Sequence, residues 1–190
     1  MSKVGGHVVS GSKNGYEEFC TAKPAVMLAV DEGGDLKLAW DKGNCYPITI
    51  FRDTTLYLEA PQGIDQMTPE QAIQTADQLY PQLKAKWDLN PADYYTVFNE
   101  PFDKADQNYP AYLAYEVRMM ELAEKDYLKL CVLNFATGSP GDLQFWKDVC
   151  VPHIKRAFQG GHIYGRHAYS IEVEDIVPLT GNTGRPFVRS

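Results

Sequence analysis

An amide and a carboxylate, Asn99 and Glu100, stand at the end of a strand-like stretch and are followed by Pro101. The stretch before them, Tyr94–Phe98, consists of aromatic residues, threonine and valine, which favour a pleated sheet. Prolines on both sides, Pro91 and Pro101, mark its limits. A carboxylate presented at a strand end can exchange a proton with a bound substrate. The same residues also suit a loop that only caps the next helix, so the motif is a hypothesis that needs its structural context.

Polar residues also stand at almost every other predicted strand end of the chain. The full set is His7, Asp31 with Glu32, Arg52 with Asp53, Asn99 with Glu100, Asn134 with Thr137, and His167 with Tyr169. In a (β/α)8 barrel the carboxyl ends of all strands meet at one mouth, where active sites are built. Each position alone is weak evidence, because polar residues begin most loops. Their recurrence on six successive runs predicts one shared cleft.

The elements that must position these residues alternate between strand and helix. Short, nearly continuous apolar runs predict strands over Lys3–Ser10, Ala25–Val30, Tyr46–Phe51, Tyr94–Phe98, Lys129–Phe135 and His162–Tyr169. Amphipathic spacing and capping residues predict helices over Gly15–Ala22, Thr68–Trp87, Tyr112–Asp126 and Gly141–Phe158, with a short helix or turn over Leu36–Lys42. Thr68, Pro69 and Gln71 form a strong helix start. Pro152 should kink or break the last helix.

This alternation predicts an α/β fold with a parallel sheet and helices outside it. Two architectures fit the pattern, an open doubly wound sheet and a (β/α)8 TIM-type barrel that is cut short. The chain has neither a GxGxxG nor a GxxxxGK[ST] motif, so nothing favours the nucleotide-binding version. We therefore expect a single domain over residues 1–190, an incomplete barrel of about six strand–helix units.

Composition narrows the classes of partner. The net charge of −7 without a basic stripe argues against nucleic acid. No stretch approaches the length of a membrane helix, and the N-terminus lacks the apolar run of a signal peptide. Localisation is left open, including an extracellular location of the full-length protein. Twelve tyrosines and three tryptophans suit stacking on sugar faces, and they suit a packed core equally well.

The cysteines and acidic residues give no metal-binding pattern. Cys20, Cys45, Cys131 and Cys150 are far apart and contain no CxxC pair, which excludes zinc-type spacing. They are most simply buried thiols, with a Cys20–Cys45 bridge left open. Asp31, Glu32 and Asp53 could form a cation site, but their spacing is not diagnostic. No metal or cofactor is expected.

The chain resembles a known clan, the retaining glycoside hydrolases with (β/α)8 barrels. The resemblance rests on Asn99-Glu100-Pro101 on the fourth predicted strand and His167-x-Tyr169 on the sixth. The opening GGHVVSGSKNGYEEFCTAKPAVMLAV is also similar to uncharacterised bacterial hydrolase-like domains of this group. The resemblance implies cleavage of a β-linked polysaccharide or oligosaccharide, with Glu100 as general acid/base and Asn99 contacting the sugar 2-hydroxyl.

Further residues take expected roles under this resemblance. His167, Tyr169 and Arg52 would orient the carboxylates, and His7 and Asn134 would contact substrate from their strand ends. Trp146 and Trp40 are candidate sugar platforms, although packing suits both. In the clan the nucleophile is a second glutamate on strand seven, whereas this chain stops after strand six. Glu172 and Glu174 follow the sixth strand too closely to be that residue.

The expected seventh strand, which would carry the nucleophile, is not part of this sequence, and this affects the predicted activity and solubility. We expect a fragment that lacks its C-terminal part and is inactive in isolation. Its two open sheet edges predict self-association. Two alternatives stay open: a non-catalytic barrel that binds carbohydrate or cell wall, and a self-sufficient open α/β domain that binds a small anionic or polar ligand.

Overall fold

A single parallel sheet organises the chain. The computed structural model describes residues 6–9, 16–34, 36–37, 46–101, 109–135 and 143–166. Its strands are β1 (Gly6–Val9), β2 (Val26–Val30), β3 (Ile48–Arg52), β4 (Tyr94–Thr96), β5 (Leu130–Phe135) and β6 (Ile163–Arg166). Every neighbouring pair is parallel, and the strands follow one another in chain order. The predicted α/β class and parallel sheet are confirmed.

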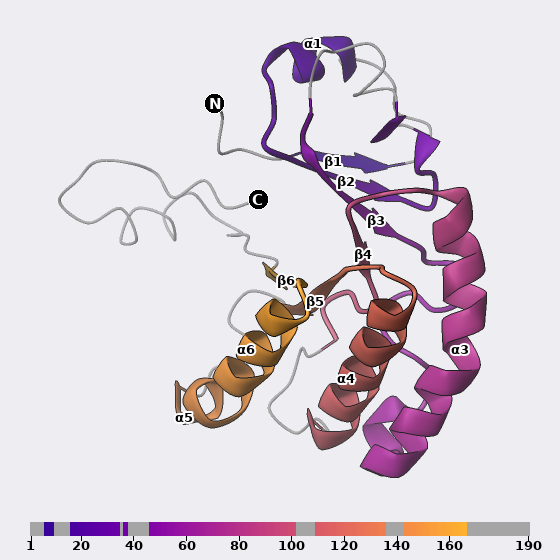
Figure 1. Cartoon of the computed structure of the whole chain (residues 1–190), viewed down its shortest axis with the longest axis vertical. Coiled ribbons are helices and arrows are strands. Elements are labelled where there is room, and N and C mark those ends of the chain that lie inside the picture. Colours follow the sequence, from indigo (N-terminus) through magenta and orange to yellow (C-terminus); the bar gives the residue numbers. More distant parts are fainter. Residues whose placement is uncertain are drawn as a thin grey trace, which may run out of the picture.

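The helices connect successive strands. They are α1 (Tyr16–Thr21), α3 (Pro69–Leu89), α4 (Tyr109–Lys125), α5 (Leu143–Phe145) and α6 (Val151–Gln159), with a 3₁₀ turn, η1, at Ile64–Gln66. Figure 1 shows α3, α4 and α6 on the same side of the sheet. A doubly wound sheet reverses its strand order and carries helices on both faces. The described strands keep their chain order, and α3, α4 and α6 lie on one side of them, which differs from the doubly wound pattern.

The start of α3 follows from its first residues. The backbone N–H of Gln71 donates to Oγ1 of Thr68 at 3.3 Å, and the N–H of Thr68 donates to Oε1 of Gln71 at 2.8 Å. Pro69 occupies the first turn, where its missing N–H has no partner to lose. The predicted capping box is therefore confirmed.

Aromatic packing attaches α3 to the sheet. Trp87 stacks on Tyr95 of β4 with ring centroids 4.9 Å apart. Tyr80 meets the same tryptophan edge-on at 5.9 Å, and Phe51 of β3 meets Tyr95 edge-on at 6.4 Å. Each such pair stabilises by about 0.5–1.5 kcal/mol beyond the area it buries. The helix and the middle strands are thus held as one unit.

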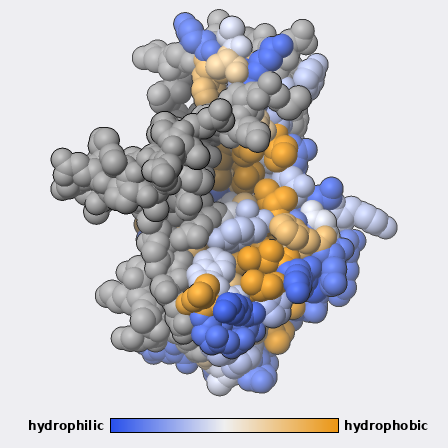
Figure 2. Space-filling model, turned by 90° about the vertical axis from the view of Figure 1, so that its left-hand side faces the viewer, coloured by the Kyte–Doolittle hydropathy of each residue, from blue (hydrophilic) through white to orange (hydrophobic). Residues whose placement is uncertain are grey.

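The two faces of the sheet differ in how well they are covered. In β2, Met27 and Ala29 are fully buried, whereas Val26, Leu28 and Val30 are only partly covered. Side chains alternate between the two faces of a strand, so the first pair lies on one face of β2 and the other three lie on the opposite, less covered face. Apolar side chains gather at the surface on the side turned away from α3 (Figure 2).

The last helical region differs from its prediction in detail. The run from Leu143 to Gln159 is divided by a π-helical turn, η2, at Trp146–Cys150. Pro152 lies in the first turn of α6, where proline is tolerated. The irregularity therefore precedes the proline. No helix in the described part of the chain is long and apolar enough to cross a membrane.

Candidate functional site

The carboxyl ends of β2 and β3 are joined by hydrogen bonds. The backbone N–H of Asp31, which follows β2, donates to the carbonyl oxygen of Arg52, the last residue of β3, at 2.8 Å. The Asp31 carboxylate accepts from the backbone N–H of Thr54 at 2.6 Å and from its hydroxyl at 2.7 and 2.8 Å. The loops after these two strands are thus held side by side.

Arg52 links the end of β3 to the segment that follows β4. Its Nη1 donates to Oδ1 of Asn99 at 2.7 Å, and its Nη2 donates to the carbonyl oxygen of Leu58 at 2.9 Å. A guanidinium can only donate, so it must face the oxygen of the Asn99 amide. The Nδ2 group of Asn99 therefore points elsewhere and is oriented as a donor. Arg52 fixes the side chain predicted to contact the sugar.

Negative charge surrounds this arginine. Burial lowers the pKa of the Arg52 guanidinium, while the charges of Asp31, Glu100 and Glu59 oppose that shift. Three carboxylates thus act on one cation, and the site has an excess of acceptors. Such a site suits a neutral ligand with hydroxyl donors better than an anion.

Glu100 lies after the carboxyl end of β4 and contacts β5. Its backbone has φ 47°, in the left-handed region that non-glycine residues rarely adopt. Its N–H donates to the carbonyl oxygen of Asn134 at 3.0 Å. Strand β4 ends at Thr96 rather than at the predicted Phe98, because the carbonyl of Val97 accepts from the Tyr57 hydroxyl at 2.8 Å. The chain turns early, and Glu100 is half-buried at the strand ends.

Strand β5 has an irregularity opposite Glu100. Leu133 and Asn134 have φ 70° and 42°, and the register with β6 shifts between Leu133 and Phe135. The Asn134 side chain is buried, and its Nδ2 donates to the carbonyl oxygen of Cys131 at 2.9 Å. Its amide is therefore used within β5, and only its main-chain carbonyl reaches Glu100. This geometry favours a structural role for Asn134.

The remaining predicted site residues are not placed with this group. His7 was predicted at a strand end, but it is the second of the four residues of β1, and only its backbone is described. His167, Tyr169 and Trp40 lie outside the described residues. Trp146 packs edge-on against Phe135 at 5.6 Å and Tyr164 at 6.2 Å, which fits the packing alternative rather than a sugar platform. The structure therefore brings together Asp31, Arg52, Asn99, Glu100 and Asn134.

Metal-ligand groups are not found in the described ranges. No three His, Cys, Asp or Glu side chains there could hold a metal ion. Within the alternative cation site, Asp31 binds Thr54, and Oδ1 of Asp53 accepts from the N–H and hydroxyl of Thr55 at 3.0 and 2.6 Å. The Asp53 carboxylate therefore shapes its own loop, and the Asp31 carboxylate joins the loops that follow β2 and β3.

The cysteines are buried. Cys131 and Cys150 are free thiols, and burial together with the charge of Glu116 raises the pKa of each to about 12. Both are therefore protonated near neutral pH and are poor nucleophiles. Cys20 is also buried, and Cys45, its expected partner in the open alternative, lies outside the described residues.

No family model, curated protein or solved structure matches this chain. The clan resemblance is therefore an inference from residues alone. The structure adds the geometry of Arg52, at the end of β3, and of Asn99 and Glu100, which follow β4.

One residue that supports the site was missed by the sequence analysis. Glu116 of α4 is 1% exposed, and its Oε1 accepts from the backbone N–H of Leu133 at 2.8 Å. It thereby satisfies a buried donor in the irregular part of β5, directly before Asn134. Helical spacing could have revealed it, because Glu116 is four residues after Tyr112 and three before Met119, both buried on the same helix face.

Proposed function

We propose that this chain is part of a retaining glycoside hydrolase, in which Glu100 is the general acid/base for cleavage of a β-linked polysaccharide or oligosaccharide. The observation that supports it most is the hydrogen bond from Arg52 to Asn99, with Glu100 next in the chain. It orients an amide donor beside a carboxyl group at the carboxyl ends of parallel strands, where barrel enzymes bind substrate.

The proposed chemistry has two steps. Glu100 protonates the leaving glycosidic oxygen and, in the second step, takes a proton from water. Asn99 donates its Nδ2 hydrogen to the sugar 2-hydroxyl, a contact that strengthens as the oxocarbenium ion develops. Arg52 acts as a positioning residue, since its Nη1 holds the amide oxygen. The second carboxyl group must lie about 5–5.5 Å away, and the clan resemblance assigns it to a seventh strand.

The finer fold belongs to the same proposal. Strand order β1 to β6 with the large helices on one side supports an incomplete (β/α)8 barrel. β1 and β6 stand at the two ends of this order. Unpaired strand edges attract other strands, so self-association through them is part of the proposal. A sedimentation coefficient that stays monomeric across a concentration series would contradict it.

The experiment that tests the acid/base is Glu100→Gln in the full-length protein. We expect hydrolysis of β-glycosides with poor leaving groups to fall by about 10²–10⁴-fold. Aryl glycosides with good leaving groups should lose much less, because their departure needs little protonation. Glu121→Gln, on the exposed side of α4, is the matched control and should change neither rate. Equal rates for Glu100→Gln and the wild type on the poor substrates would rule Glu100 out.

A non-catalytic carbohydrate-binding barrel uses the same geometry. The excess of acceptors around Arg52 supports a neutral sugar in either case, and it disfavours the small anionic ligand of the open α/β alternative. Binding of β-linked oligosaccharides without hydrolysis, weakened by Asn99→Ala, would favour this second candidate.

A further inference from the structure

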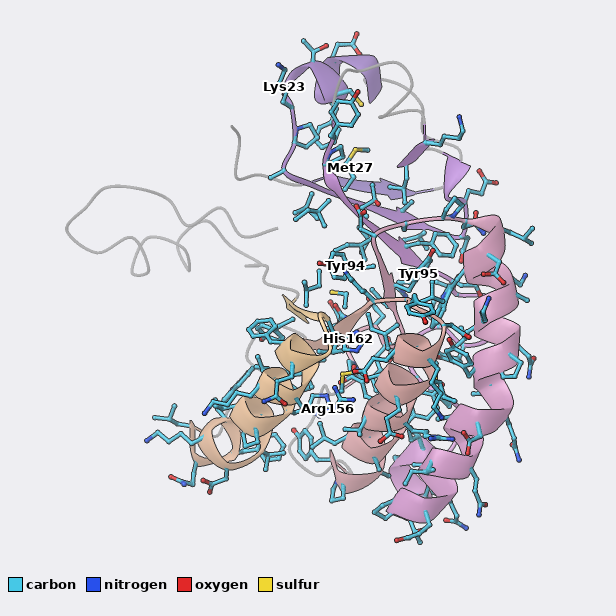
Figure 3. All side chains as sticks on the ribbon, viewed as in Figure 1. Lys23, Met27, Tyr94, Tyr95, Arg156 and His162 are labelled. Atoms are coloured by element: carbon cyan, nitrogen blue, oxygen red, sulfur yellow. The ribbon has the colours of Figure 1, made fainter. Side chains whose placement is uncertain are left out.

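A hollow lies at the opposite end of the strands from Glu100. It has a volume of about 650 Å³ and is lined by residues at the amino ends of β3, β4 and β5. This volume falls within the range of small-molecule sites. Tyr46 and Ile48 lie before and at the start of β3, and Asp93 and Tyr94 lie before and at the start of β4. Tyr127 and Lys129 lie before β5. Figure 3 shows Tyr94 at β4 beside Tyr95, which belongs to the aromatic packing under α3.

Tyr127 occupies a position at which helices prefer glycine. After α4, the N–H of Leu128 donates to the Ala123 carbonyl at 2.8 Å, and the N–H of Tyr127 donates to the Glu124 carbonyl at 3.1 Å. These two bonds define a Schellman motif, and Tyr127 has the left-handed φ of 59° that its C′ position requires. Glycine adopts this conformation without strain, whereas tyrosine does so at a free-energy cost.

The end of α6 provides an internal comparison. There the N–H of His162 donates to the Ala157 carbonyl at 3.0 Å, and the N–H of Gly161 donates to the Phe158 carbonyl at 3.1 Å. The pattern is the same, and Gly161 takes the left-handed position with φ 78°. Tyr127 is 93% exposed, so packing does not offset the strain of its backbone. Helix termination alone gives no reason for a tyrosine here.

A second tyrosine stands on the rim of the same hollow. Tyr46 is 78% exposed, and Tyr94 adds a half-buried ring within the hollow. Exposed aromatic rings with a polar end are enriched at binding surfaces, because they contribute contact area with little loss of conformational entropy. These three rings suit a flat ligand that presents both C–H groups and hydroxyls.

The charged side chains that line the hollow indicate which ligands it can bind. Asp93 and Lys129 contribute one negative and one positive charge. Oδ2 of Asp93 already accepts from the N–H and the hydroxyl of Thr49 at 2.8 and 2.9 Å. The balance is neutral, in a chain whose net charge is −7. An acidic polymer or a nucleic acid is therefore disfavoured, and a neutral ligand fits.

From these observations we infer that the Tyr46–Tyr94–Tyr127 hollow is a binding surface for a neutral saccharide, separate from the strand ends that carry Glu100. The sugar stacks on the exposed rings and hydrogen-bonds to the tyrosine hydroxyls and the two charged side chains. The site adds retention on a polymer and takes no part in proton transfer.

The test is retention of the 190-residue protein on soluble β-1,4-glucan and β-1,4-mannan in affinity electrophoresis. We expect at least one polymer to retain the wild type, and Tyr127→Gly and Tyr46→Ala each to weaken retention by about tenfold, equivalent to about 1.4 kcal/mol. Tyr127→Gly should keep or raise the unfolding midpoint, so lost retention cannot be attributed to unfolding. Phe158→Ala, which removes an exposed ring on α6, is the matched control and should not change retention.

The outcomes separate this site from the proposed catalysis. Glu100→Gln should leave retention unchanged, and Tyr127→Gly should leave any hydrolysis of a small aryl glycoside unchanged. Absent retention of the wild type, or equal retention of both tyrosine variants, would overturn the inference. A wild-type dimer that becomes monomeric in Tyr127→Gly, without retention on either polymer, would identify the hollow as a contact between copies and would also overturn it.

Discussion

Oε2 of Glu116 lies 2.6 Å from Nε2 of His153, and both side chains are almost fully buried. The pair joins α4 to α6, while the other carboxylate oxygen accepts from the N–H of Leu133 in β5. One side chain therefore connects three elements behind the strand that supports Glu100. Removing one partner of such a buried pair strongly destabilises the folded protein, because the other partner is left buried without a hydrogen bond.

Glu116→Ala should lower the free energy of unfolding by about 3–5 kcal/mol, because it leaves His153 and the Leu133 N–H without their partner. Glu116→Gln should lower it less, since its amide oxygen can still accept from Leu133. Urea denaturation measures both, with Glu121→Ala on the surface of the same helix as the control. A loss for Glu116→Ala no larger than that of the control would show that the pair is unimportant for stability.

His162 should make stability depend on pH. Its Nδ1 accepts from the N–H of Leu130 at 2.8 Å, so the proton must be on Nε2, which lies 3.1 Å from Oε1 of Glu124. Figure 3 shows His162 and Arg156 between α6 and α4, where Arg156 binds the same carboxylate. A second proton on the ring would face the Leu130 N–H and break this hydrogen bond.

Burial lowers the pKa of His162; the charges of Glu124 and Glu116 oppose this shift, and that of Arg156 adds to it. The folded protein then binds the proton less readily than the unfolded chain, whose histidine pKa is about 6.5. The stabilising contribution is complete above that pH and is lost as the pH falls below it. We expect the thermal unfolding midpoint of the wild type to decrease when the pH is lowered from 7.5 to 5.5. The decrease should be smaller in His162→Asn, because asparagine keeps an acceptor but does not titrate. An equal pH dependence in both proteins would contradict this assignment.

Much of the fold could be predicted because its causes are local. The apolar runs predict the strands, and the Thr68–Gln71 capping box predicts the start of α3. The proximity of Arg52, Asn99 and Glu100 could be predicted because strand ends in a parallel sheet share one edge. Glu116 was missed because its partners lie 17 and 37 residues away in the chain. The early end of β4 was missed for the same reason, since Tyr57 binds Val97 from 40 residues away.

Gly165 of β6 should be essential for the packing of β5. A Cβ atom there would overlap Oδ1 of Asn134 and would lie 2.6 Å from Sγ of Cys131. Both atoms belong to buried side chains with little room to move. Gly165→Ala should therefore lower the free energy of unfolding by about 1–3 kcal/mol or more, measured by thermal or urea unfolding.

The control for this prediction is Gly34→Ala. A Cβ at Gly34 meets nothing within 4 Å, so the substitution should be neutral or slightly stabilising. Similar stabilities for the two alanine variants would mean that β5 and Asn134 can shift to make room.

Arg52→Lys should separate positioning from stability. Arginine makes two hydrogen bonds here, to Asn99 and to the Leu58 carbonyl, and a lysine ammonium cannot reproduce that planar fork. Arg52 is partly exposed, so we expect a stability loss of no more than about 1 kcal/mol. Under the proposed function, the larger effect falls on the orientation of the Asn99 amide.

The readout that distinguishes these effects is the sugar 2-hydroxyl. If Arg52 holds Asn99 for that group, Arg52→Lys should reduce kcat/KM about tenfold more for a β-glycoside than for its 2-deoxy analogue, equivalent to about 1.4 kcal/mol. Asn99→Ala should show the same selectivity, and the double variant should add little to either, because both changes remove one interaction. Equal losses on the two substrates would mean that Arg52 supports the strand ends without orienting the amide.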